Sequence, residues 1–145
     1  MRFEGENGVS RFSIDFVVAN NRDLVKAEDG LFDPAKVRKF TIKGVVDSGA
    51  TRLVLPQSIA KQLGLPTTGK VKVRYADGHT AHRNQVDNVH VEILGRSTTC
   101  WAIVEPRRRN ALIGAILLED LDLLIDCRHE RLVPRDPKYV VSEIE

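Results

Sequence analysis

The residues best suited to chemistry are Asp47-Ser48-Gly49-Ala50-Thr51, which stand between two apolar runs, residues 44–46 and 53–55. The tripeptide Asp-Ser-Gly is common in turns, because the Asp side chain caps a turn and glycine adopts a positive φ. A turn that only reverses the chain gains nothing from apolar residues on both sides. Acid–base catalysis, in contrast, uses carboxylates whose proton affinity is altered by burial. The flanking residues therefore favour Asp47 as a catalytic carboxylate.

A second motif, Leu112-Ile113-Gly114, runs directly into residues 115–121, which are apolar and then acidic. Because glycine has no Cβ, another backbone segment or the loop of Asp47 can approach closely at Gly114. An ordinary strand-to-helix junction would have the same local sequence. The order and spacing of the two motifs favour a shared site.

Together the two motifs resemble those of retropepsin-like aspartic peptidases, the single-domain relatives of pepsin, of the stand-alone, soluble microbial kind. The resemblance is best over residues 40–125 and implies one domain over residues 1–145. It implies an all-β fold, a closed barrel or sandwich with a flap hairpin and two short helices, forming one half of a two-lobed site. It makes Asp47 catalytic, gives Ser48 a hydrogen bond across a dimer, and places the Gly49 N–H on the carboxylate. Ala50 and Thr51 complete the match.

Only one Asp-Ser-Gly or Asp-Thr-Gly occurs in the 145 residues. Aspartic peptidases activate water with two carboxylates that share a proton, one acting as base and the other as acid. The expected enzyme is therefore a homodimer that cleaves a peptide or protein substrate with one Asp47 from each subunit. By the same resemblance, residues 10–20 and 138–145 are candidates for the subunit interface.

Two further segments are assigned to substrate binding by their position relative to the motifs. Ala76-Asp77-Gly78-His79 falls where the family has its flap, although a plain surface hairpin would use the same residues. Arg107-Arg108-Arg109 lies in the loop before Leu112, which lines substrate pockets in members of the family, so the resemblance implies a place at the rim of the substrate pocket. A charge run is often only a solvated face, but at a pocket rim it would favour acidic groups.

The remaining pattern is rich in strands. Alternating apolar residues predict strands over residues 11–18 and 40–47, hairpins over 71–82 and 89–104, and a last hairpin over 121–133. Short helices are expected over residues 56–64 and after Gly114, the latter with a polar face of Glu119, Asp120 and Asp122. Residues 20–39 are charged and rich in turn formers, which predicts an exposed connection.

Composition excludes several classes of function. A net charge of +2 with interspersed signs gives no nucleic-acid-binding stripe, and no apolar run is long enough to span a membrane. Residues 1–7 lack the features of a signal peptide, so a cytoplasmic protein is expected. Cys100 and Cys127 are expected to be free thiols. The four histidines have no metal-site spacing, and neither a metal nor another cofactor is expected.

Two other interpretations remain open. The first is a retropepsin-like fold kept for peptide binding or dimerisation, with cleavage that is absent or highly selective. The second is a small β-barrel partner module in which the loop of Asp47 is purely structural.

Overall fold

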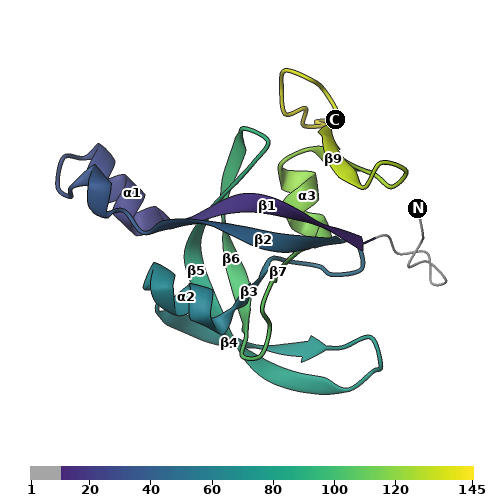
Figure 1. Cartoon of the computed structure of the whole chain (residues 1–145), viewed down its shortest axis with the longest axis horizontal. Helices are drawn as coiled ribbons and strands as arrows, with labels where there is room; N and C mark the ends of the chain where they lie inside the picture. The colour runs from purple at the N-terminus through teal and green to yellow at the C-terminus, as the bar shows by residue number, and fades with distance from the viewer. Residues whose placement is uncertain (1–10) are drawn as a thin grey trace.

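The computed structural model describes residues 11–145, which are mostly strands (Figure 1). The elements are, in order, β1 (Arg11–Asn20), α1 (Asn21–Glu28), the 3-10 helix η2 (Pro34–Lys36), β2 (Lys39–Asp47), β3 (Val54–Pro56), α2 (Gln57–Leu63), β4 (Thr67–Arg74), β5 (Thr80–Ile93), β6 (Arg96–Glu105), β7 (Ala111–Ile113), α3 (Ala115–Asp120), β8 (Leu123–Asp126) and β9 (Arg131–Pro134). The predicted all-β fold is confirmed. The N-terminal residues 1–7 and residue 10 of the expected interface segment lie outside the described residues.

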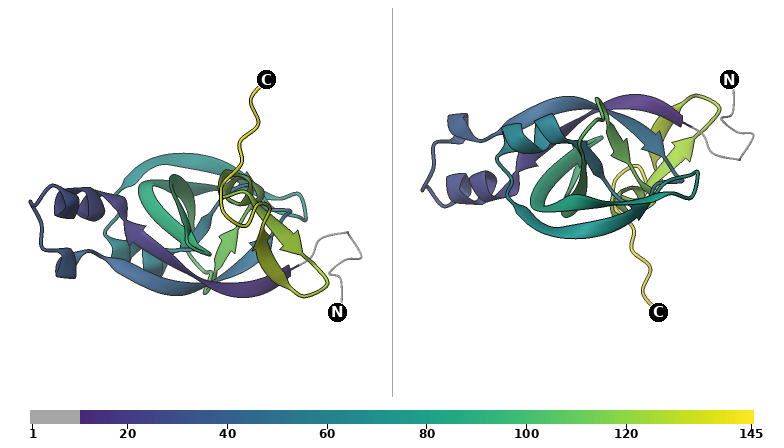
Figure 2. Two further views of the ribbon diagram at one scale, coloured as in Figure 1. Left: turned by 90° about the horizontal axis from the view of Figure 1, so that it is seen from above. Right: turned by 90° about the horizontal axis from the view of Figure 1, so that it is seen from below.

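Six strands close into a barrel. The hydrogen-bonded order is β1-β2-β7-β3-β6-β5-β4, and β1 also pairs with β5 through residues 17–20 and 89–92. The β1–β5 pairing closes the ring and leaves β4 attached outside it, as the two views of Figure 2 show. The β1–β5 pairing covers part of an edge of β1 that would otherwise expose unpaired backbone groups. The barrel also gives β2 and β7 fixed neighbours at the site described below.

The barrel is filled by alternate residues of its strands, as period-two patterning requires. On β1, Phe12, Phe16 and Val18 are buried and Ile14 packs against them. The largest fully buried side chains elsewhere include Val46, Leu53, Leu55, Leu63, Val86, Val89, Val91, Ile113 and Leu121. The two apolar runs beside Asp47 therefore belong to this core.

The prediction that residues 20–39 form an exposed connection is wrong in one respect, because this segment contains helix α1. The Asn20 side chain caps this helix and accepts hydrogen bonds from the backbone N–H groups of Arg22 (2.9 Å) and Asp23 (3.1 Å). Asp23 is buried and accepts from Arg38 Nε (2.8 Å) and Nη2 (3.0 Å). These hydrogen bonds lower the pKa of Asp23. A long-range ion pair thus holds a helix that its own sequence, poor in apolar residues, does not predict.

The two predicted helices are present as α2 and α3. Helix α2 ends at Gly64, whose φ of 69° is the left-handed conformation typical of glycine at this position. Pro56 precedes α2 as its N-cap and does not occupy its first turn. None of the helices in residues 11–145 is long and apolar enough to span a membrane.

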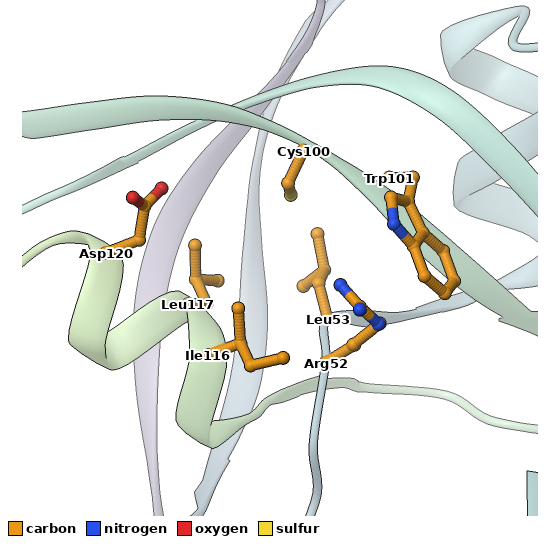
Figure 3. A pocket seen from close by; sticks show the side chains of 7 residues that line it. All are labelled: Arg52, Leu53, Cys100, Trp101, Ile116, Leu117 and Asp120. Atoms are coloured by element: carbon orange, nitrogen blue, oxygen red, sulfur yellow. The ribbon is translucent and has the colours of Figure 1, made fainter.

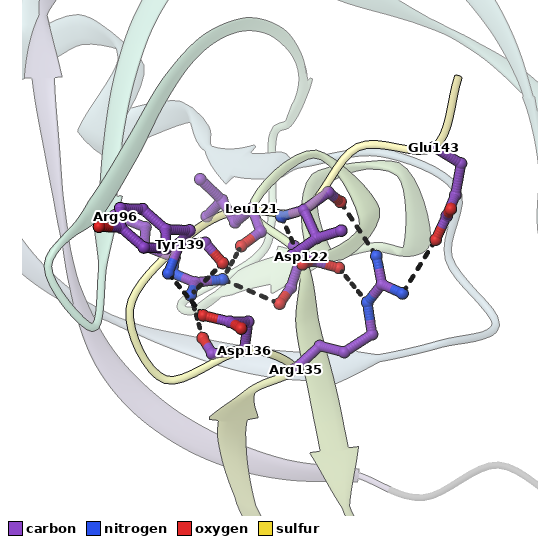
Figure 4. Close-up of polar contacts among 8 residues, drawn as sticks. Arg96, Leu121, Asp122, Arg135, Asp136, Tyr139 and Glu143 are labelled. Carbon is purple, nitrogen blue, oxygen red and sulfur yellow. Dashed lines mark hydrogen bonds and ion pairs between the residues drawn. The ribbon is translucent and has the colours of Figure 1, made fainter. Parts of the chain in front are cut away.

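Asp122 does not lie on the polar face of α3, as the sequence predicted, but beyond the end of the helix, where it is buried. Its carboxylate accepts from Arg135 Nε (2.7 Å) and from the Val141 N–H (2.9 Å). Arg96 at the start of β6 donates to the carbonyls of Leu121 and Tyr139 (Figure 4). These bonds attach the C-terminal residues to the barrel.

Candidate active site

Asp47 is the last residue of β2, and the chain turns immediately after it. Its Oδ1 accepts a hydrogen bond from the Gly49 N–H (2.9 Å), and its carbonyl accepts from the Ala50 N–H (3.0 Å). The hydrogen bond expected from Gly49 is therefore present. Asp47 is 5% exposed, whereas Ser48 and Gly49 are exposed. The loop (residues 47–51) thus buries the carboxylate of its first residue, whereas the two residues that follow are exposed to solvent.

Strand β7 lies beside the loop of Asp47 and holds it in position. Residues 111–113 pair in parallel with residues 44–46 of β2, and Leu112 also faces Val54 of β3. Because β7 lies between the strands that enter and leave the loop, it holds both ends of the loop at a fixed separation. The motif Leu112-Ile113-Gly114 therefore holds the loop of Asp47 in place.

The close approach predicted at Gly114 is confirmed. A Cβ built on Gly114 would lie 2.7 Å from the backbone N and O of Arg52 and from the carbonyl carbon of Thr51. Just beyond, the Ala115 N–H donates to the Ala50 carbonyl and the Ile116 N–H to the Thr51 carbonyl, both at 2.9 Å. The first turn of a helix has N–H groups without intrahelical partners, and here the loop accepts two of them.

Arg11 forms an ion pair with the Asp47 carboxylate. The antiparallel register of β1 and β2 places Arg11 opposite Asp47, and Arg11 Nη2 is 3.1 Å from Asp47 Oδ2. The sequence pattern predicted Arg11 only as the start of a strand. Alternation along the two strands predicted both of them, but it did not specify the register that joins these two residues.

The segment expected to be the flap, Ala76 to His79, forms the exposed turn between β4 and β5. The turn is wider than the two-residue hairpin predicted around Asp77-Gly78, because the Tyr75 N–H donates to the His79 carbonyl (2.9 Å). Asp77 Oδ1 accepts from the His79 N–H, and these contacts lower the pKa of Asp77. Figures 1 and 2 place the turn at the same end of the molecule as the end of β2, opposite α1.

The base of this hairpin is attached to the end of β6. Tyr75 Oη donates to Glu105 Oε2 (2.6 Å), and Arg83 Nε donates to Glu105 Oε1 (2.7 Å). Burial, followed by the hydrogen bond with Glu105, raises the pKa of Tyr75. The His79 ring stacks on Tyr75 with centroids 4.4 Å apart. The two hydrogen bonds to Glu105 join residues far apart in the sequence, and no local sequence signal pointed to them.

Arg107, Arg108 and Arg109 lie in the loop between β6 and β7. Arg107 and Arg109 are exposed, and Arg108 Nε donates to the Asn110 carbonyl (2.9 Å). Glu105 precedes this loop and binds the flap base, so the three arginines follow directly after the flap's attachment point.

A small hollow opens beside the loop of Asp47 (Figure 3). Its lining residues are Arg52, Leu53, Cys100, Trp101, Ile116, Leu117 and Asp120. The guanidinium of Arg52 lies 4.0 Å from the centroid of the Trp101 ring, a cation–π contact. With a volume of about 30 Å³, the hollow has room for a water molecule and not for a peptide side chain.

Burial raises the pKa of Cys100 to about 11, and Cys100 and Cys127 are both free, as predicted. Across residues 11–145, no three His, Cys, Asp or Glu side chains are grouped as metal ligands would be.

A closed barrel with a buried Asp in an Asp-Ser-Gly loop, held by an apolar-apolar-Gly strand, defines a retropepsin-like domain. Residues 34–120, more than half of the chain, match the family described as gag-polyprotein putative aspartyl protease. The chain belongs to this family of retropepsin-like aspartyl proteases. Comparison with curated proteins gives no match. The family match includes the loop, the flap and Gly114, but neither β1 with Arg11 nor the final hairpin.

Proposed function

We propose that the protein is an aspartic endopeptidase whose active site forms between two identical subunits, each contributing Asp47. The observation that carries the proposal is the buried carboxylate of Asp47 on a loop fixed by β7 and α3. Since the sequence has one such loop, the second carboxylate comes from another copy. Ser48 is exposed on the separate subunit, where it can reach the neighbouring loop. Symmetric dimers are the commonest assemblies that duplicate a site in this way.

In this mechanism the two Asp47 carboxyls share one proton, because like charges about 3 Å apart do not both ionise. The ionised carboxylate takes a proton from a water molecule, and the oxygen of that water attacks the peptide carbonyl carbon. At the same time the protonated carboxyl donates its proton to the carbonyl oxygen. The carboxyl that took the proton from water then donates it to nitrogen as the C–N bond breaks, and the other carboxylate takes a proton from a hydroxyl of the tetrahedral intermediate, which restores the starting pair. The Gly49 N–H, already bound to Oδ1, keeps Asp47 oriented throughout.

The substrate of the proposed enzyme is an extended peptide held beneath the flap turn, Ala76 to His79. Such hairpins exclude water when they close over a bound chain. Arg107 and Arg109 are free to meet acidic side chains of the peptide at the pocket rim, because both are exposed beside the flap's attachment point. Two free cysteines suit a reducing compartment, and we propose a cytoplasmic location.

A peptide-mixture assay read by mass spectrometry tests the activity. We expect wild-type protein to cleave between about pH 4 and 7 and Asp47→Asn to lose at least about 10³-fold in rate, the range of acid–base catalysis. Asp15→Asn makes the same change at an exposed position of β1 and serves as the matched control. Activity per molecule should also fall on dilution below the dimer dissociation constant. Cleavage by Asp47→Asn at the wild-type rate would refute the proposal.

The alternative function is peptide binding or dimerisation without general proteolysis. The ion pair between Arg11 and Asp47 favours it, since a cation already compensates the charge of the carboxylate in the separate subunit. If wild-type protein is dimeric and cleaves no peptide in the mixture, this alternative replaces the peptidase.

A further inference from the structure

Both oxygens of the Asp47 carboxylate are occupied within one subunit. Oδ1 accepts from the Gly49 N–H at 2.9 Å, and Oδ2 lies 3.1 Å from Nη2 of Arg11. The first contact belongs to the loop itself. The second comes from the start of β1, a strand that lies outside the residues matched by the family. The ion pair is therefore a feature of this chain's N-terminal strand added to the family's loop.

The two partners differ in their freedom to move. The Asp47 side chain is 7% exposed and is fixed by the loop, whereas the Arg11 side chain is 52% exposed. Nine consecutive residue pairs between β1 and β2, from Arg11–Asp47 to Ala19–Lys39, set the backbone position of Arg11. The guanidinium can thus swing into solvent while its backbone stays beside the loop.

This ion pair conflicts with a working pair of carboxylates. A buried carboxylate needs compensation, either from a cation or from a shared proton. An arginine beside a carboxylate favours its ionised form, and two ionised carboxylates repel each other at the distance that catalysis requires. Arg11 bound to Asp47 and a proton shared with a second Asp47 are therefore alternative ways to compensate the same charge.

We propose that Arg11 is the counter-ion of Asp47 in the separate subunit and that it must leave the carboxylate before the two-subunit site can form. This inference rests on the proposed homodimeric site. Arg11 then stabilises the dissociated protein, weakens subunit association and keeps the dilute enzyme inactive. Association and activation then occur in one step. In this exchange each Asp47 loses its contact with the Arg11 guanidinium and gains a contact with the Asp47 carboxyl of the other subunit.

Sedimentation velocity measurements on the full chain test this exchange directly. Arg11→Gln removes the two ion pairs that association must break, one in each subunit, so we expect its dimer dissociation constant to fall about 30-fold, the equivalent of two ion pairs of about 1 kcal/mol each. Arg11→Lys keeps the charge and should remain closer to wild type. Lys43→Gln removes one positive charge from an exposed position of β2, away from Asp47, and should leave the constant unchanged.

Circular dichroism first establishes that each variant is folded. A dissociation constant for Arg11→Gln that equals or exceeds the wild-type value would overturn the inference, and so would an equal decrease in Lys43→Gln. An increase would indicate that Arg11 supports the interface.

Peptide cleavage measured on the same samples separates this inference from the proposed function. Tighter association of Arg11→Gln without cleavage by any variant would leave the counter-ion role standing and remove the peptidase. Cleavage by wild type with unchanged association of Arg11→Gln would do the reverse. If no variant dimerises at the highest concentration, both are refuted.

Discussion

Replacing Gly114 with alanine tests how the active-site loop is positioned. Gly114 has φ −92° and ψ 178°, a conformation that alanine adopts without strain. The effect of the substitution is therefore purely steric. The new methyl group would lie 2.7 Å from three backbone atoms of Thr51 and Arg52. Backbone atoms cannot move away by a change of rotamer, so the loop itself has to shift.

The size of the effect follows from that distance. The loop and β7 must separate by about 0.7 Å to restore the ordinary contact distance of 3.4 Å. The same shift stretches the two hydrogen bonds from Ala115 and Ile116 to the loop carbonyls, now 2.9 Å. Overpacking of this kind costs about 1–3 kcal/mol, and three backbone contacts place Gly114→Ala near the upper end. A displacement approaching 1 Å at the catalytic group lowers the rate by up to about 100-fold.

Urea denaturation followed by the fluorescence of Trp101, the single tryptophan, measures the free energy of unfolding. Gly69→Ala is the matched control, because a Cβ at Gly69 would meet only Gln85 Oε1 at 3.8 Å. We expect a loss of about 3 kcal/mol for Gly114→Ala and a change within about 0.5 kcal/mol for Gly69→Ala. Equal stability of the two variants would show that the loop does not depend on the missing Cβ.

Three further predictions concern other parts of the chain. Asp23→Asn should lower the free energy of unfolding at neutral pH by about 2 kcal/mol, because Asp23 is buried and its partner Arg38 is half exposed. Since Arg38 lowers the folded-state pKa of Asp23 below 3.8, this difference should be present above pH 3.8 and disappear as the pH falls through the folded value in acid denaturation. Cys100, with its pKa raised to about 11, should react with iodoacetamide more slowly in native than in unfolded protein, and equal rates by mass spectrometry would contradict its burial. Tyr75→Phe removes the hydrogen bond to Glu105, worth about 1 kcal/mol, and should raise KM for a cleaved peptide about fivefold, whereas an unchanged KM would exclude a role in flap closure.

The loop of Asp47 and the approach at Gly114 could be predicted because each depends on short, contiguous sequence. Apolar residues beside Asp47 indicated a buried carboxylate, and a glycine after Ile113 indicated a close backbone neighbour. Both signals are local, and the spacing of the two motifs along the chain supplied the rest of the prediction.

What could not be predicted depends on contacts between distant residues. Helix α1 has few apolar residues, and it is held by Asn20 and by the ion pair of Asp23 with Arg38, fifteen residues away. The pairing of Arg11 with Asp47 depends on strand register, which alternation alone leaves open. Asp122 was assigned to the surface of a helix, but its carboxylate is satisfied by Arg135 and Val141 in the C-terminal segment.

The hydrogen bonds between α3 and the loop of Asp47 also affect when the site can form during translation. The Ala50 carbonyl receives its partner from Ala115, which leaves the ribosome about 3 to 13 s later at roughly 5–20 residues per second. Until then β7 is also missing from between β2 and β3. When Asp47 has left the ribosome but Ala115 has not, the loop of Asp47 therefore lacks both of these supports. The order of synthesis therefore delays formation of the complete loop of Asp47 until most of the chain has been made.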